Sequence, residues 1–214
     1  MASKFRIMSL IAILGIALLS GAQTQGYPQI TVIVRPTAEL PIDLLSDAED
    51  RAARIFEKAG VSVQWLNCFH RGGAFLEQAC AEPPTRADLV IQVIPRARNA
   101  ADSVFGMSFV DADGGVFADI FFDRVQQLHA QNPQISLSRL LGSVIAHELG
   151  HLLLGEHSHS SRGLMQAHWS SEQLKRLEMG NLLFDSKAAA QLRSRAATLD
   201  ARRRPVILAS GARN

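Results

Sequence analysis

The sequence is poor in cysteine, in tyrosine and in net charge. It has two cysteines and one tyrosine in 214 residues, and 22 Lys and Arg residues stand against 20 Asp and Glu. A balance this close to neutral gives no reason to expect a nucleic-acid partner. No internal repeat is present, which argues against a repeat architecture. A chain of this length has room for one main domain with extensions.

The longest apolar run lies near the N-terminus. Residues 7–19 are apolar, Lys4 and Arg6 precede them, and small residues follow at 20–22. This layout is typical of a cleaved secretory signal. A retained anchor is the alternative, but a spanning helix needs about 20 apolar residues. We therefore expect residues 1–22 to be a signal peptide, and the mature protein to be secreted or periplasmic, with no stable membrane anchor and no long pro-segment.

The first half of the mature chain predicts strands around one helix. Residues 30–34, 61–65 and 88–94 are rich in β-branched or apolar side chains, as in strands. Between the first two, Ser46 and Glu49 form a capping-box pattern that opens a helix, and a glycine ends it. A strand–helix–strand unit with short joints implies parallel pairing.

The second half predicts one more strand and several helices. A turn at 111–115 precedes a strand at 116–122, and helices are expected over 123–129, 138–154, 170–178 and 185–199. The fold class is therefore α/β, with a mixed twisted sheet of about four strands that begins with a βαβ unit. We expect residues 23–169 to form the main domain, 170–200 a small helical part beside it, and 201–214 a disordered basic tail.

The most specific pattern in the chain is an HExxH motif in the helix expected over 138–154. His147 and His151 are four residues apart, so they lie on one face of a helix, one turn apart. Imidazoles at this spacing are typical zinc ligands, and Glu148 can accept a proton from a water that the metal activates. The alternative is a chance match in which the imidazoles are ordinary polar groups. The glycine stop and the further histidines that follow favour metal binding.

Cys68 and Cys80 are predicted to form a disulfide, which an oxidising compartment favours. Gly72 and Gly73 lie between them and let the chain turn back. A bridge that closes a loop of this size stabilises the fold by roughly 3 kcal/mol. The alternative is that one thiolate binds the metal as a latency switch, but a bridge explains both cysteines together.

The residues of the motif resemble those of the metzincin zinc peptidases, and not those of the gluzincins. In metzincins a third histidine follows the HExxH segment, and a methionine turn, here at Met165, lies beneath the metal. More closely, the chain is similar to small exported bacterial proteins described as matrixin- or adamalysin-like metalloproteases, through residues 147–155, a following His-Ser pair and Gly-Leu-Met at 163–165. The resemblance implies a zincin-like fold over 23–169 and one catalytic Zn²⁺; its specific part is residues 147–165.

The resemblance leaves two candidates for the third zinc ligand. The metzincin pattern has glycine at the position of Leu154, whereas here the glycine follows at Gly155. Counting along the motif favours His157, and the similarity to the exported bacterial proteins favours His159. Both histidines remain candidates for the third ligand, and His159 is preferred. The histidine that does not bind the metal is expected to support the site or to be a solvated loop residue. A helix one residue longer would place Ser158 at the expected position, and serine does not suit this role.

These observations predict a secreted zinc-dependent metalloendopeptidase with Glu148 as general base and a peptide or protein as substrate. An extended peptide is expected to pair with the strand at 116–122, near Ala118 and Asp119. The tyrosine that some metzincins have after the methionine is missing, and His168 stands nearby instead. Two alternatives remain, an exported non-catalytic zinc-binding domain and a zinc hydrolase of a non-peptide substrate. The presence of Glu148 argues against the first.

Overall fold

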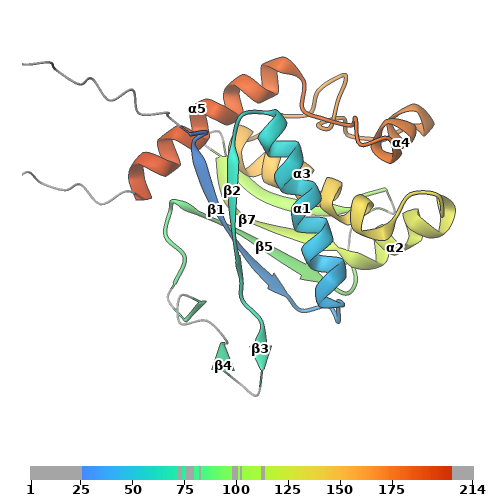
Figure 1. Ribbon diagram of the computed structural model, residues 1–214, viewed down its shortest axis with the longest axis horizontal. Coiled ribbons are helices and arrows are strands. Elements are labelled where there is room, and N and C mark those ends of the chain that lie inside the picture. Colours follow the sequence, from blue (N-terminus) through green and yellow to red (C-terminus); the bar gives the residue numbers. More distant parts are fainter. Residues whose placement is uncertain are drawn as a thin grey trace, which may run out of the picture.

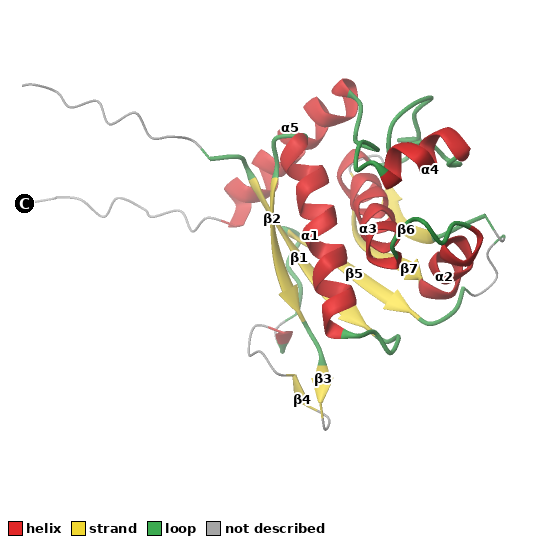
Figure 2. Ribbon diagram, turned by 45° about the vertical axis from the view of Figure 1, so that its right-hand side comes forward, coloured by secondary structure: helices red, strands yellow, loops and turns green. Residues whose placement is uncertain are grey.

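The structure is a computed structural model that describes residues 26–71, 74–75, 80–81, 83–97, 101, 103–111 and 114–203. A five-stranded mixed sheet carries helices on one face (Figure 1). Its strands are β1 (Gln29–Pro36), β2 (Ser62–Asn67), β5 (Asp88–Ile94), β6 (Gly106–Asp111) and β7 (Gly114–Phe121). The helices are α1 (Ile42–Lys58), α2 (Phe122–Gln131), α3 (Leu137–Leu154), α4 (Ser171–Glu178) and α5 (Ser186–Arg203). A separate hairpin of β3 (His70–Arg71) and β4 (Ala74–Phe75) extends beyond the end of the sheet (Figure 2).

The strand order is β2-β1-β5-β7-β6, with four parallel strands and an antiparallel edge strand, β6. The parallel βαβ unit predicted at the start of the chain is confirmed, because β1 and β2 pair in parallel and α1 connects them. Both faces of β1 are buried over residues 30–34, as is usual in a parallel sheet, so its sequence reads as a continuous apolar run. The predicted α/β class is confirmed, while the count of about four strands was one short for the main sheet.

The strand missed by the sequence prediction is β6, which forms a hairpin with β7. The strand predicted at 116–122 therefore lies inside the sheet and not at its edge. The strand β7 pairs with β5 on one side and with β6 on the other, so it is not an edge. The prediction that a peptide pairs with β7 beside Ala118 and Asp119 is therefore wrong, because its backbone hydrogen bonds are already used within the sheet.

Helix α1 begins five residues earlier than predicted, because its N-cap is Pro41 and the predicted cap was Ser46. Pro41 precedes its first residue, Ile42, and makes no side-chain capping bond. The predicted capping box of Ser46 and Glu49 is wrong, because both lie inside the helix. Glu49 faces the sheet instead, where its Oε2 accepts a hydrogen bond from Asn67 Nδ2 at 3.1 Å.

Helices α1 and α3 cross in close contact over the sheet. At the crossing, a Cβ added to Gly142 would lie 2.3 Å from the carbonyl oxygen of Ala48 and 2.8 Å from Arg51 Cβ. Glycine at this position therefore lets the two helix backbones approach. The contact fixes α3, which carries the HExxH motif, beside α1 on the same face of the sheet; its apolar residues are buried with those of β1, β5 and β7.

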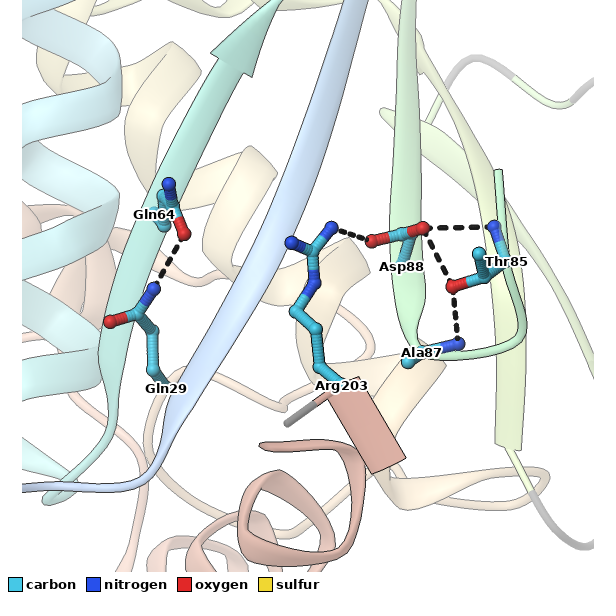
Figure 3. Close-up of polar contacts among 6 residues, drawn as sticks. All are labelled: Gln29, Gln64, Thr85, Ala87, Asp88 and Arg203. Atoms are coloured by element: carbon cyan, nitrogen blue, oxygen red, sulfur yellow. Dashed lines mark hydrogen bonds and ion pairs between the residues drawn. The ribbon is translucent and has the colours of Figure 1, made fainter. Parts of the chain in front are cut away.

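The C-terminal helices are tied to the rest of the fold by polar contacts. Ser170 caps α4 in a capping box with Gln173, at the start of the helix predicted over 170–178. Helix α5 extends to Arg203, so residues 201–203, which were expected to belong to the tail, are helical. Arg203 pairs with Asp88 at the start of β5 (Figure 3). The Asp88 carboxylate also accepts hydrogen bonds from the amide and hydroxyl of Thr85, both at 2.8 Å. Residues 204–214 and the predicted signal peptide, 1–22, lie outside the described residues.

The predicted disulfide is confirmed. Cys68 and Cys80 are bonded, and both are buried against Ile33 and Val90 on the sheet face opposite α1. This arrangement leaves neither thiolate available to bind a metal. A disulfide is compatible with an extracellular location. Within the described ranges, no helix has the combination of length and apolar character that a membrane crossing requires.

Candidate metal centre

The motif helix α3 presents His147 and His151 on one face. Ser136 caps its start by accepting a hydrogen bond from the Arg139 amide, and Gly155 stops it, as predicted. The two rings have centroids 4.8 Å apart, and their Nε2 atoms are 3.1 Å apart. One helical turn therefore brings the two nitrogen atoms to the same point in space, as the spacing in the sequence predicted.

His159 brings a third nitrogen to this point. Its Nε2 lies 3.1 Å from Nε2 of His151. Within the described residues, His147, His151 and His159 form a cluster whose ring nitrogens are close enough to hold one metal ion. The chain reaches this position through two left-handed residues, Gly155 at φ 81° and His157 at φ 54°. His157 is exposed and is not part of the cluster. Of the two candidates left open by the sequence, the structure places His159 beside the motif.

The Nδ1 atoms of the two helical histidines are held by groups that the sequence analysis did not identify. His147 Nδ1 lies 2.8 Å from the carbonyl oxygen of Leu164, to which it donates. His151 Nδ1 lies 2.7 Å from Ser158 Oγ. A carbonyl oxygen only accepts, so the contact with Leu164 places the ring proton of His147 on Nδ1 and leaves the lone pair of Nε2 free for a metal. The hydroxyl of Ser158 can accept from His151 Nδ1 and support the same tautomer there. Ser158 was not expected to bind the metal, and its role is instead to hold the ring of His151.

The environment keeps the three rings neutral. Burial lowers the pKa of His147 to about 4, a shift that the hydrogen bond to Leu164 opposes and His159 reinforces. Burial and the neighbouring rings of His147 and His159 lower the pKa of His151 to about 3. The pKa of the more exposed His159 is also lowered, first by burial and then by His168. A neutral imidazole is the form that binds a metal, so the cluster is ready to do so at neutral pH.

The spacing of the nitrogens fits a zinc ion. Ligand atoms at about 2.0–2.1 Å in a tetrahedral set are about 3.3 Å apart. The two 3.1 Å separations between Nε2 atoms are close to that edge length. Three unprotonated nitrogens that face one another repel unless a cation lies between them. The donor set and its geometry are therefore compatible with Zn²⁺, with a fourth position left for another ligand.

Glu148 lies beside this cluster and is buried, with 6% of its surface exposed. Its Oε2 accepts a hydrogen bond of 2.7 Å from Ser108 Oγ, on the edge strand β6. Burial raises the pKa of Glu148 to about 7, and the Ser108 bond opposes the shift. A carboxyl group with a pKa near neutrality can both accept and donate a proton under ordinary conditions. Ser108 was not identified from the sequence.

Met165 is buried and packs against the motif helix. A Cβ added to Gly150 would lie 2.6 Å from Met165 Sδ, so glycine at this position lets the methionine sit against the helix backbone between His147 and His151. The turn before it passes through Gly163 at φ 75°, where the Leu164 amide bonds the carbonyl of Leu183. Met165 therefore packs against the segment of α3 that carries His147 and His151.

A cavity of about 350 Å³ opens over the cluster. His147, Glu148, His151 and His159 lie on one side, and β6 contributes Gly106, Ser108 and Val110. An apolar wall is formed by Val144, Phe105 and Trp169, the last two with stacked rings. His168 also lines the cavity, whereas Asp119 does not. The cavity therefore combines a metal-compatible centre, a buried carboxylate and an apolar surface.

Comparisons with known proteins leave the family open. No protein-family profile and no curated protein matches the sequence. Among solved structures, the chain is similar to archaemetzincin from Methanopyrus kandleri, with a TM-score of 0.48 and 17% identity, covering 81% of this chain and 98% of that one. This likeness is too distant to assign a family or an activity, and the matrixin- or adamalysin-like resemblance stays a prediction. The site itself establishes a three-histidine cluster compatible with zinc, beside a buried carboxylate.

Proposed function

We propose that this protein is an exported zinc-dependent hydrolase that cleaves peptide bonds. The observation that carries the proposal is the convergence of three neutral imidazoles, His147, His151 and His159, next to the carboxyl group of Glu148 in one cavity. A non-catalytic zinc site has no need of a buried carboxyl group with a pKa near 7 at its border. Export is supported by the signal-like N-terminus and by the Cys68–Cys80 disulfide.

In this mechanism the histidines hold the metal and Glu148 moves the proton. When Zn²⁺ is bound, it supplies Lewis acidity, which lowers the pKa of water and polarises a carbonyl group. Glu148 accepts a proton from the water that attacks the scissile carbonyl carbon. It then donates this proton to the leaving amine nitrogen, so the carboxyl group returns to its starting state. The hydrogen bonds at Leu164 and Ser158 keep the rings of His147 and His151 in place throughout.

The edge strand β6 is the element best placed to align a peptide. Its residues Gly106, Ser108 and Val110 line the cavity, and within the described residues no strand pairs with its outer edge. An extended peptide can therefore add to this edge through backbone hydrogen bonds. This corrects the expectation for β7 and moves the proposed substrate contact one strand outward, directly beside Glu148.

The test is digestion of a peptide library by protein expressed without residues 1–22, with Zn²⁺ and with a chelator. We expect cleavage that the chelator abolishes and added Zn²⁺ restores. The variant E148Q should retain zinc and lose cleavage by about two orders of magnitude or more. The matched control E156Q changes an exposed glutamate in the following loop and should cleave like the wild type.

Three other outcomes contradict the proposal. Chelator-sensitive hydrolysis of esters without peptide cleavage would identify a non-peptide hydrolase. Stoichiometric zinc without turnover of any substrate would identify a binding domain. Undiminished cleavage by E148Q would remove Glu148 from the mechanism.

A further inference from the structure

We propose that Ser108 is a positioning residue that fixes the carboxyl group of Glu148 for catalysis. The inference rests on the proposed function, because it concerns the group that moves the proton there. The hydroxyl of Ser108 comes from β6, 40 residues earlier in the chain than Glu148, and lies outside the HExxH motif. Within the described part of the chain, Ser108 is the hydrogen-bond partner of the Glu148 carboxylate.

The geometry around Ser108 Oγ is specific. It lies 2.7 Å from Glu148 Oε2 and 3.1 Å from the backbone carbonyl oxygen of the same residue. A hydroxyl group has one proton and donates to one of these oxygens at a time. The carboxylate oxygen is the nearer, and a bond to an ionised acceptor is the stronger. Ser108 therefore engages Oε2 and leaves Oε1 as the oxygen able to meet a reacting water.

A second residue of β6 shapes the same contact. A Cβ added to Gly106 would lie 2.7 Å from both Cγ and Cδ of Glu148. Glycine at 106 thus makes room for the Glu148 side chain, and Ser108, two residues along on the same face of the strand, binds its end. The inward face of β6 is fitted to Glu148, which leaves the carboxyl group little freedom to rotate.

This restraint has a consequence beside a metal. An ionised carboxylate is attracted to a nearby dication and can become a ligand in its own right. The cluster of mutually close donor atoms contains the three histidines and does not include Glu148. The bond from Ser108 holds the carboxylate in that position, beside the cluster. We infer that Ser108 keeps Glu148 acting as a base and prevents it from acting as a fourth ligand.

The experiment compares S108T with S108V. These side chains have nearly the same shape, but only threonine keeps the hydroxyl donor. We expect S108T to retain most of the wild-type kcat, and S108V and S108A to lose about 10- to 100-fold in kcat. KM and zinc content should stay at wild-type values. S143A, which removes a buried hydroxyl on α3 that has no hydrogen-bond partner in the described ranges, should leave kcat unchanged. Equal kcat values for S108T and S108V would overturn the proposal.

A measurement on the metal-free protein tests the bond without catalysis. S108A should lower the midpoint of thermal unfolding by clearly more in the wild-type background than in the E148A background, where the carboxylate is gone and only the backbone carbonyl of residue 148 remains as an acceptor. Additive shifts would show that the two side chains do not interact and would overturn the inference. If the wild type cleaves no peptide, the proposed function fails while this coupling can still be present; if the wild type is active and S108V equals it, only the role of Ser108 fails.

Discussion

The substitution E49Q should stabilise the protein at neutral and alkaline pH. Glu49 lies on α1 with 5% of its surface exposed, and its Oε1 is buried without a partner among the described residues. Burial raises its pKa from 4.5 to about 7, the bond from Asn67 opposes the shift, and Asp50 adds to it. Glutamine has the same shape, stays neutral, and can still accept the bond from Asn67.

The magnitude and sign follow from proton linkage. Below pH 4.5 the carboxyl group is protonated in both the folded and the unfolded chain, so Glu49 costs nothing. As the pH rises from 4.5 to about 7, the unfolded chain loses this proton and the folded protein keeps it, so stability falls. A rise of the pKa from 4.5 to about 7, at 1.36 kcal/mol for each tenfold change in proton affinity, makes the loss about 3 kcal/mol, complete above the folded pKa. E49Q has no titrating group at this position, so its stability should not fall for this reason.

The assay is urea unfolding of both proteins, stripped of metal and with the disulfide intact, at intervals from pH 4.5 to 8.5. The difference between E49Q and wild type cancels other titrating groups, including Glu148. We expect this difference to be near zero at low pH and to grow to about 3 kcal/mol at pH 8. E57Q, the same change at an exposed position of α1, should show no such growth. A difference that does not vary with pH, or a less stable E49Q at pH 8, would refute the reasoning.

Three further predictions concern the centre and its supporting helix. H159A should weaken Zn²⁺ binding by about two orders of magnitude, at about 3 kcal/mol for one lost ligand, whereas H157A should bind like the wild type; competition with a chromophoric chelator measures both. In the same assay S158A, which removes the partner of His151 Nδ1, should weaken binding about 10- to 100-fold, and an unchanged affinity would remove that role. G142A should lower the free energy of unfolding by about 1–3 kcal/mol, because the added Cβ clashes with Ala48 O at the α1–α3 crossing. Alanine favours an isolated helix, so a stabilised variant would contradict this packing.

The sequence predicted the motif helix and its ligand pair well because both depend on local geometry. The distance from His147 to His151 is one helical turn, and Gly155 ends the helix with a positive φ. The third ligand depends on the path of a loop, and counting residues could not choose between His157 and His159. The left-handed conformation of His157 directs that residue away and brings His159 to the cluster.

Two misses have physical causes in the tertiary structure. Ser46 and Glu49 have the spacing of a capping box, but the helix already begins at Ile42, so both residues lie inside it and Glu49 is buried. The strand β6 has a reversed pattern, with Gly106 and Ser108 facing inward toward Glu148 and with Met107 and Phe109 exposed by 41% and 52%. Strand prediction looks for apolar residues inside and polar residues outside. In β6 the small and polar residues face inward because they line the cavity beside Glu148.

The most direct test of the proposed centre is the zinc content of the purified protein, measured by elemental analysis against protein concentration. One Zn²⁺ per chain is expected for the wild type, removed by a strong chelator and restored on addition of Zn²⁺. The double variant H147A/H151A should fold, as judged by its far-UV circular dichroism, and contain no zinc. A wild-type protein that takes up no stoichiometric zinc, or a double variant that holds as much zinc as the wild type, would contradict the assignment.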